Sequence, residues 1–459
     1  MTLSTAWRLA RPRSAADRGR FLLIACATAI AGALLLAAAH VLRLPAGPGE
    51  QTDGLASYVA ESGLRGGVVI AVLLLTVPVL ALALQALRVG SVARDRRMAS
   101  LRLAGATPRD ARVIAAAEAG AAAAAGGVLA GAGYVALWLA LGVLPPSGSR
   151  MLATPDVLDL PAWAALVVLC ASAGALAGAA VQRRAIVEPL GVRRRRAPRL
   201  PGRANLAALG AGVVLVLCGL LLIPRLGSDG GDAAVALAIA LAGLLLAAFA
   251  GGPRLVLGCA RVLARRRGAA ALLAQRRLRA DPRSPGRVAA VLVVCGIALG
   301  IEALLAVQAI GLDNGTDPAF YLAGYGMAAA VVLVAAAVAL LTLLVGAADA
   351  LLDARQPLAT LAALGVDERL LVRVVARQLS ATAVPAIVLG VFVGGPAIAV
   401  LGAVGAGDGG FGFVMQAIVP TLLAALVAGL ALAAVARLAA RLLRSLIRAA
   451  IDPENLRVA

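Results

Sequence analysis

Glu302 is the one ionisable side chain that lies clearly inside a long apolar stretch of this 459-residue sequence. A carboxylate is costly to hold away from water, and those found inside membrane spans commonly bind a cationic group or carry protons. The structural alternative is that Glu302 lies near the end of its apolar stretch, where a neighbouring group or water forms hydrogen bonds with the carboxylate. Both interpretations stay open here: an intramembrane substrate or proton contact, and a structural carboxylate.

Side chains for bond chemistry or metal binding are otherwise dispersed. The five cysteines lie in or beside apolar stretches without CxxC spacing, and the single histidine, His40, stands at the edge of another. A phosphate-binding Walker loop needs a lysine, whereas all 43 basic residues are arginine. The polar segments hold no nucleophile with a base and an orienting residue. The sequence predicts no catalytic residue, no metal site and no cofactor bound by this chain.

Two polar segments, about 260 positions apart, share one pattern around a glycine. In the first segment, Met98, Leu101 and Gly105 have the spacing i, i+3 and i+7. Leu358, Leu361 and Gly365 have the same spacing in the second. It places apolar side chains on one face of a short helix, which a left-handed glycine would end. Thr107 and Asp110 can cap the helix that follows Gly105. Asp367 and Glu368 supply the equivalent acids in the second copy, so the predicted unit is helix, glycine break, capped helix.

The elements that carry these residues are membrane spans. Apolar residues make up 62% of the chain and charged residues 14%, which predicts an all-α polytopic integral membrane protein. A span needs about 20 mostly apolar residues. About ten transmembrane helices are expected, at residues 21–42, 66–88, 113–144, 161–181, 205–223, 233–253, 288–311, 323–352, 373–405 and 415–436.

The arginines follow the positive-inside rule, which sets the predicted orientation. With the N-terminus in the cytoplasm, all but Arg43, Arg65, Arg150 and Arg225 fall on the cytoplasmic side. Both termini are then cytoplasmic (N-in, C-in). The run 193–196 has no interleaved aromatic residues, so attraction to anionic membrane lipids explains it better than binding of nucleic acid.

The glycine segments belong to a longer internal repeat. Pro12, Arg13 and Ser14 before the first span are matched by Pro282, Arg283 and Ser284 before the seventh. We therefore expect two parallel four-helix repeats joined by two linking helices. The expected divisions are a first half at 1–182, a linker with spans five and six at 183–267, a second half at 268–446 and a cytoplasmic tail at 447–459.

The repeated segment resembles a known family. MASLRLAGATPRDARVIAAAEA, with glycine-rich apolar sequence after it, is similar to the FtsX-like permease domain of ABC transporters, a group that includes MacB-like and lipoprotein-releasing permeases. The second copy, PLATLAALGVDERLLVRVVARQL, matches less closely, because Gln378 stands where the first has Glu118. The resemblance covers about 66–182 and 323–440, and no large extracytoplasmic domain separates the spans.

The resemblance implies a permease subunit in the cell membrane that works with a separate cytosolic ABC ATPase homodimer, which binds ATP and Mg. The short helices would be coupling helices, and their ATPase contacts would be Arg96, Arg97, Met98, Leu101, Gly105, Ala106, Thr107, Leu358, Leu361, Gly365, Val366 and Asp367. The expected activity is export or extraction of an amphipathic or lipophilic substrate, with no enzymatic reaction in this chain. Two alternatives stay open: an ATPase-coupled signalling subunit that moves nothing, and a secondary transporter that uses Glu302.

Overall fold

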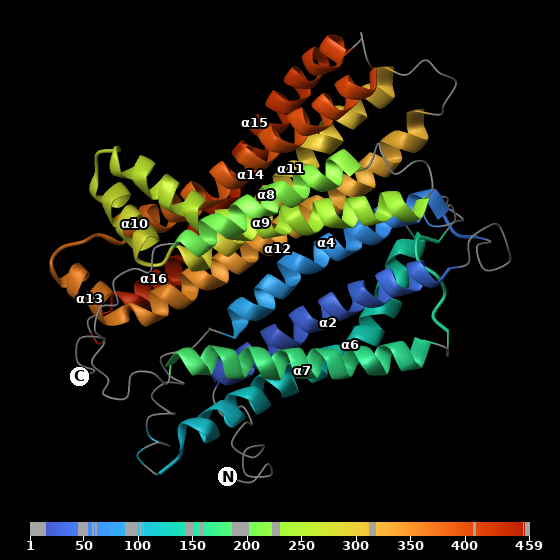
Figure 1. Ribbon diagram of the computed structural model, residues 1–459. Coiled ribbons are helices and arrows are strands. Elements are labelled where there is room, and N and C mark those ends of the chain that lie inside the picture. Colours follow the sequence, from blue (N-terminus) through green and yellow to red (C-terminus); the bar gives the residue numbers. More distant parts are fainter. Residues whose placement is uncertain are drawn as a thin grey trace. The chain divides into compact units, whose positions relative to one another are not determined.

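The chain was examined as a computed structural model (Figure 1), and every regular element in it is an α-helix. The residues that it describes are 15–44, 54–56, 59, 62–87, 100, 103, 105–143, 150–156, 159–185, 202–222, 230–311, 318–406, 410–452 and 454. An isolated β-bridge between Leu55 and Arg150 is the only strand-like pairing among them. The all-α class predicted from composition is confirmed for these residues.

Nine helices in the described part of the chain are long and apolar enough to cross a membrane. Another helix, α4, carries a shorter apolar stretch at Ala71–Ala86, where the second span was expected. The protein is therefore a multi-pass membrane protein. Several of its helices are longer than a crossing needs, among them α6 and α12 with 36 residues each and α14 with 39. At about 1.5 Å per residue they reach roughly 54 and 58 Å, against about 30 Å of hydrocarbon.

The contacts divide the chain into two compact units, Met1–Arg194 and Arg195–Ala459. Unit 1 contains α2 (Ala15–Arg43), α4 (Ser62–Ala86), α6 (Pro108–Val143) and α7 (Leu160–Ala185). α6 packs on both α2 and α7, and α2 also packs on α4. Gly126 allows the closest approach of α6 to α2, because a Cβ there would overlap Thr28 and the carbonyl of Ala25. Small residues of this kind let helices pack in lipid, where the hydrophobic effect adds little between them.

Unit 2 contains the remaining helices. The long ones are α8 (Arg203–Leu222), α9 (Gly230–Ala264), α11 (Arg283–Gly311), α12 (Pro318–Asp353), α14 (Glu368–Ala406) and α15 (Gly410–Leu442). α14 packs on α11 and α15, and α11 also packs on α12 and α9. The pair α8 and α9, which we expected to link two halves, lies within this unit.

Three short helices gather at one end of unit 2, around the second glycine (Figure 1). They are α10 (Ala269–Ala280), α13 (Arg355–Ala363) and α16 (Arg444–Ala450). We call the end of each unit that holds Gly105 or Gly365 its break end, and the opposite end its far end. α2 and α6 run in the same direction, because Arg20 pairs with Glu118 at the break end and His40 meets Tyr134 at the far end.

Candidate functional site

The break in unit 2 lies between α13 and α14 and is built around Gly365. Its φ of 89° is in the left-handed region, which costs a residue with a Cβ about 1–2 kcal/mol. The amide of Gly365 donates to the carbonyl of Ala362 at 2.9 Å, and that of Val366 to Leu361 at 3.1 Å. These two bonds form the Schellman pattern that closes a helix C-terminus. The predicted order of helix, glycine break and helix is confirmed here.

The carbonyl of Asp367 begins the helix after this break. It accepts from the amide of Leu370 at 3.0 Å and from that of Leu371 at 3.4 Å. The side chain of Asp367 is exposed, where its charge favours the positive N-terminal end of α14. Asp367 thus has the N-terminal position predicted for it.

The first break, at Gly105, has the same backbone conformation, with φ of 94°. After it, α6 begins with a capping box between Thr107 and Asp110. The amide of Thr107 donates to Oδ2 of Asp110 at 2.9 Å, and the amide of Asp110 donates to Oγ1 of Thr107 at 3.3 Å. The capping predicted from sequence is therefore confirmed. Four of the predicted ATPase contacts, Arg96, Arg97, Met98 and Leu101, lie outside the described residues.

An exposed leucine precedes each of the two glycines. Leu103 is 92% exposed and Leu364 is 77% exposed. Leu358, by contrast, is 1% exposed, and Leu361 and Val366 are half-buried. The apolar stripe that we expected on the surface of the second copy is thus turned inward at Leu358. The i, i+3, i+7 spacing did not identify the leucines that are exposed.

The buried side of the second break is covered by α16, which contacts α12, α13 and α14. Ile447 of α16 is completely buried. Glu368, the first residue of α14, forms ion pairs with Arg448 at 2.9 Å and with Arg444 at 3.1 Å. Residues 447–459 were expected to form a short polar tail, but the segment begins within a helix that packs on the break.

A buried ion pair joins α2 to α6 at the break end of unit 1. Nη2 of Arg20 donates to Oε2 of Glu118 at 2.5 Å, and the two side chains are only 10% and 8% exposed. Charges buried to this degree need a partner, since desolvation is expensive. In the sequence Glu118 stood out only through the family pattern. Its partner lies 98 positions away, beyond the reach of any local pattern.

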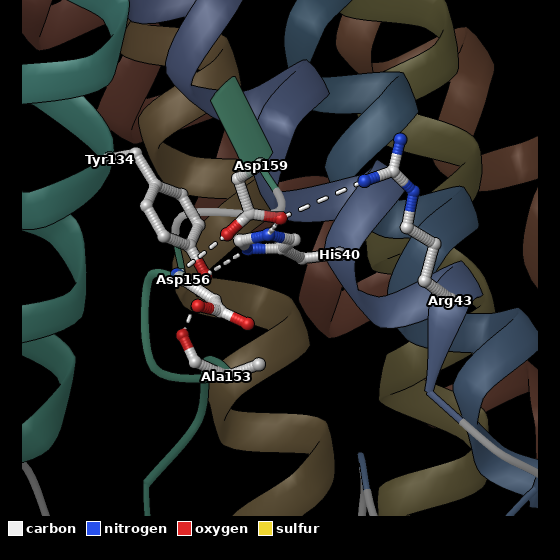
Figure 2. Close-up of polar contacts among 6 residues, drawn as sticks. All are labelled: His40, Arg43, Tyr134, Ala153, Asp156 and Asp159. Carbon is white, nitrogen blue, oxygen red and sulfur yellow. Dashed lines mark hydrogen bonds and ion pairs between the residues drawn. The ribbon is translucent and has the colours of Figure 1, made fainter. Parts of the chain in front are cut away.

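A polar cluster lies at the far end of unit 1 (Figure 2). Nδ1 of His40 is 2.6 Å from the hydroxyl of Tyr134, and Nε2 contacts Oδ1 of Asp159. The Tyr134 hydroxyl also donates to the carbonyl of Ala153 at 2.7 Å. Nη1 of Arg43 is 3.7 Å from the same Asp159 oxygen. The cluster joins α2, α6 and the segment before α7. The sequence placed His40 at the edge of an apolar stretch but did not predict these contacts.

Segments between the helices close over the same far end. The amide of Ala56 donates to the carbonyl of Arg150 at 2.9 Å, and the amide of Arg150 donates to Gly54 at 2.7 Å. The Arg150 guanidinium lies 3.9 Å above the ring of Trp138. Val59, in the segment between α2 and α4, is only 1% exposed and packs in the core of unit 1 with Ala38 and Val41.

Glu302 lies in α11 of unit 2, on a different helix from those that flank the break at Gly365. Within the described part of the chain, its Oε2 atom is buried without a hydrogen-bond partner, and so is Nε2 of Gln308 on the same helix. An unsatisfied carboxylate oxygen favours the interpretation that another group binds there. The geometry of α11 alone does not name that group.

Among the residues that the structure describes, no three histidine, cysteine, aspartate or glutamate side chains lie close enough together to hold a metal ion. The chain matches no protein-family model, no curated protein and no solved structure in the three comparisons made.

Proposed function

We propose that this chain is the transmembrane permease subunit of an ABC transporter. In this proposal the two glycine breaks dock on a cytosolic ATPase homodimer, which binds ATP and Mg and drives the permease. The chain itself catalyses no reaction. It moves an amphipathic or lipophilic substrate out of the cell or out of the outer leaflet.

One observation carries the proposal: the same positive-φ glycine is followed by an overlong helix in both units. Gly105 precedes α6 and Gly365 precedes α14, and both helices exceed the thickness of the hydrocarbon. A continuous helix that begins outside the bilayer and continues through it can carry a displacement at its end toward the far side. A chain with two such inputs suits a partner with two identical subunits.

The packing behind the second break supports transmission of force. Close contacts between glycines join α14 to α11: Cα of Gly296 would be 2.8 Å from a Cβ at Gly390. Backbones this close leave no side chains between them to absorb a displacement. A push on α14 should therefore move α11 with it, and α11 carries Glu302.

The internal packing of each unit supports the proposed duplication. In unit 1 the first span contacts the second and third, and the third contacts the fourth. In unit 2 the order α11, α12, α14 and α15 repeats these pairings. That order and the charge distribution support the proposed parallel repeat, with both termini cytoplasmic and the arginines inside.

Exposed apolar faces on the long helices support a substrate that reaches the permease from the bilayer. Large apolar side chains are exposed along α7 and α15, such as Leu176 at 72% and Val427 at 65%. These faces suit lipid, and a substrate dissolved in the bilayer can reach the permease between its helices. The cell membrane is accordingly the proposed location.

Purification from the native host tests the proposal. The full chain, extracted in mild detergent, should carry with it an ATPase that hydrolyses ATP, with two ATPase subunits per chain. The double variant Leu103→Asp with Leu364→Asp should capture at least about tenfold less ATPase than the wild-type chain. The reason is that a charge buried without a partner in an apolar contact costs at least about 1.4 kcal/mol of binding free energy. Both leucines are exposed, so the chain itself should stay folded.

Val262→Asp is the matched control, because Val262 is 59% exposed but lies on α9, which belongs to neither break. It should leave capture of the ATPase unchanged. Capture that is equal in the double variant, or no ATPase with the wild-type chain, would overturn the docking proposal.

The two remaining readings give distinct results in proteoliposomes. A signalling subunit would capture the ATPase yet show no ATP-dependent movement of an amphipathic dye. A secondary transporter, which the unsatisfied Oε2 of Glu302 favours, would move its substrate on a proton gradient without any ATPase. Glu302→Gln would abolish that movement.

A further inference from the structure

The short helix α10 lies at the membrane edge of unit 2. It has 12 residues, too few to cross a bilayer, and it connects the apolar helices α9 and α11. These two helices are in close contact, since a Cβ on Gly252 of α9 would overlap the carbonyl of Gly286 on α11. α10 therefore connects two neighbouring candidate membrane spans, Ile239–Ala264 and Arg283–Ile310.

The inner face of α10 packs on the start of α14. Ala270 and Ala274, with Leu273 beside them, form a cluster with Val374 and Leu370 of α14. Leu370 lies in the first turn of α14, two residues after Glu368, where α14 begins behind the second break. α10 is therefore a rigid cover on the helix that starts at Gly365.

The outward face of α10 combines one exposed leucine with exposed arginines. Leu272, Arg276 and Arg279 are all exposed and follow the i, i+4, i+7 spacing of one helix face. On α14 a second row of exposed arginines, Arg369, Arg373 and Arg377, repeats every fourth residue on the flank beside the face that packs on α10.

Of the described residues, none forms an ion pair with the two exposed arginines of α10 or with the row on α14. The two nearest acids in the sequence are engaged elsewhere. Oδ1 of Asp281 accepts from the amides of Arg283 and Ser284, and Glu368 pairs with the arginines of α16.

We propose that the exposed faces of α10 and of the first turns of α14 form a docking surface for the headgroups of anionic phospholipids. Guanidinium groups bind phosphate oxygens through paired hydrogen bonds, and an exposed leucine at the membrane edge inserts among acyl chains. An acidic protein would match the charge equally well, but it would leave Leu272 in water. Position, charge and the exposed leucine together select a lipid.

This surface does not depend on the proposed function, but it would act on the same break. A bound headgroup bridges α10 and α14, and so steadies the helix that begins at Gly365. Anionic lipid is then expected to stabilise the break end of unit 2 whether or not an ATPase docks there.

Native mass spectrometry of the full chain tests the proposal. The chain is released from nanodiscs of phosphatidylcholine with added phosphatidylglycerol, and the retained phosphatidylglycerol is counted. The triple variant Arg276→Gln, Arg279→Gln and Arg373→Gln should bind phosphatidylglycerol more weakly, by at least about fivefold in affinity for each arginine removed. This factor corresponds to about 1 kcal/mol for each charge. Replacing the same three residues with lysine should keep most of the retention, because the charge stays.

Arg109→Gln with Arg355→Gln is the control, since both residues are exposed at the breaks but lie on neither arginine row. It should retain the lipid like the wild-type chain. Equal retention by the glutamine variant would overturn the proposal. So would loss of a captured soluble protein from that variant with its lipid retained, because the surface would then belong to a protein partner. Soluble glycerol phosphate should not displace the lipid, and displacement would likewise contradict a membrane source.

Discussion

The two units differ in the residues that join the first span of each to its third. Unit 1 uses the buried pair of Arg20 and Glu118. By the offsets of the repeated segments, Ala290 and Gln378 stand at the equivalent positions of unit 2, and Ala290 is completely buried. Unit 2 thus lacks both the arginine and the glutamate. This is expected, because either charge buried without the other would carry a high desolvation cost.

Removing one partner of this pair should be far worse than removing both. Glu118→Gln leaves the Arg20 guanidinium buried beside a neutral group and should lower the free energy of unfolding by about 3–5 kcal/mol. The double variant Arg20→Ala with Glu118→Gln, which copies unit 2, should recover much of that loss. Thermal unfolding of the chain in detergent measures both, and additive losses from the two substitutions would contradict a coupled pair.

At the scale of elements, much of the fold could be predicted and some of the site could not. Spans such as α7 and α8 follow from apolar length alone, and the breaks follow from glycine with nearby caps, because these signals lie within a few residues of one another. The cover of α16 over Leu358 and the cluster of His40 with Tyr134 and Asp159 join residues far apart in the sequence. Neither has a local pattern, so neither was predicted.

The break between α13 and α14 offers a clean test of its backbone conformation. A Cβ on Gly365 would meet nothing within 4 Å, so Gly365→Ala should cost only the left-handed backbone, about 1 kcal/mol. Local hydrogen exchange at the amides of residues 365 and 366 should then be roughly fivefold faster. Gly365→Asn should exchange more slowly than Gly365→Ala, because asparagine tolerates this region.

Gly412→Ala is the matched control for the break. It also has open space around its Cβ position, but it lies inside α15 without a positive φ. Alanine should be neutral or slightly stabilising there. Faster exchange at 365 and 366 in the Gly412 variant, or none in the Gly365 variant, would refute the assigned role of the left-handed glycine.

At the scale of the whole molecule, the two units share a packing order but differ at their ends. Unit 1 has a far end closed by the cluster of His40, Tyr134 and Asp159, and unit 2 has a break end reinforced by α10 and α16. In the proposed transporter both breaks dock the ATPase, and the two units differ in what supports them. In unit 2, α10 and α16 pack behind the docking break. In unit 1, the polar cluster holds the far end in place.

Photo-crosslinking from position 364 tests the central claim most directly. A photoreactive residue in place of Leu364, which is 77% exposed beside Gly365, should form a crosslink to an ATP-hydrolysing subunit in native membranes. The same residue in place of Leu422, which is 50% exposed within α15, should crosslink only to lipid. Crosslinks from position 364 to lipid alone, in membranes where the protein is active, would contradict the proposal that the breaks dock an ATPase.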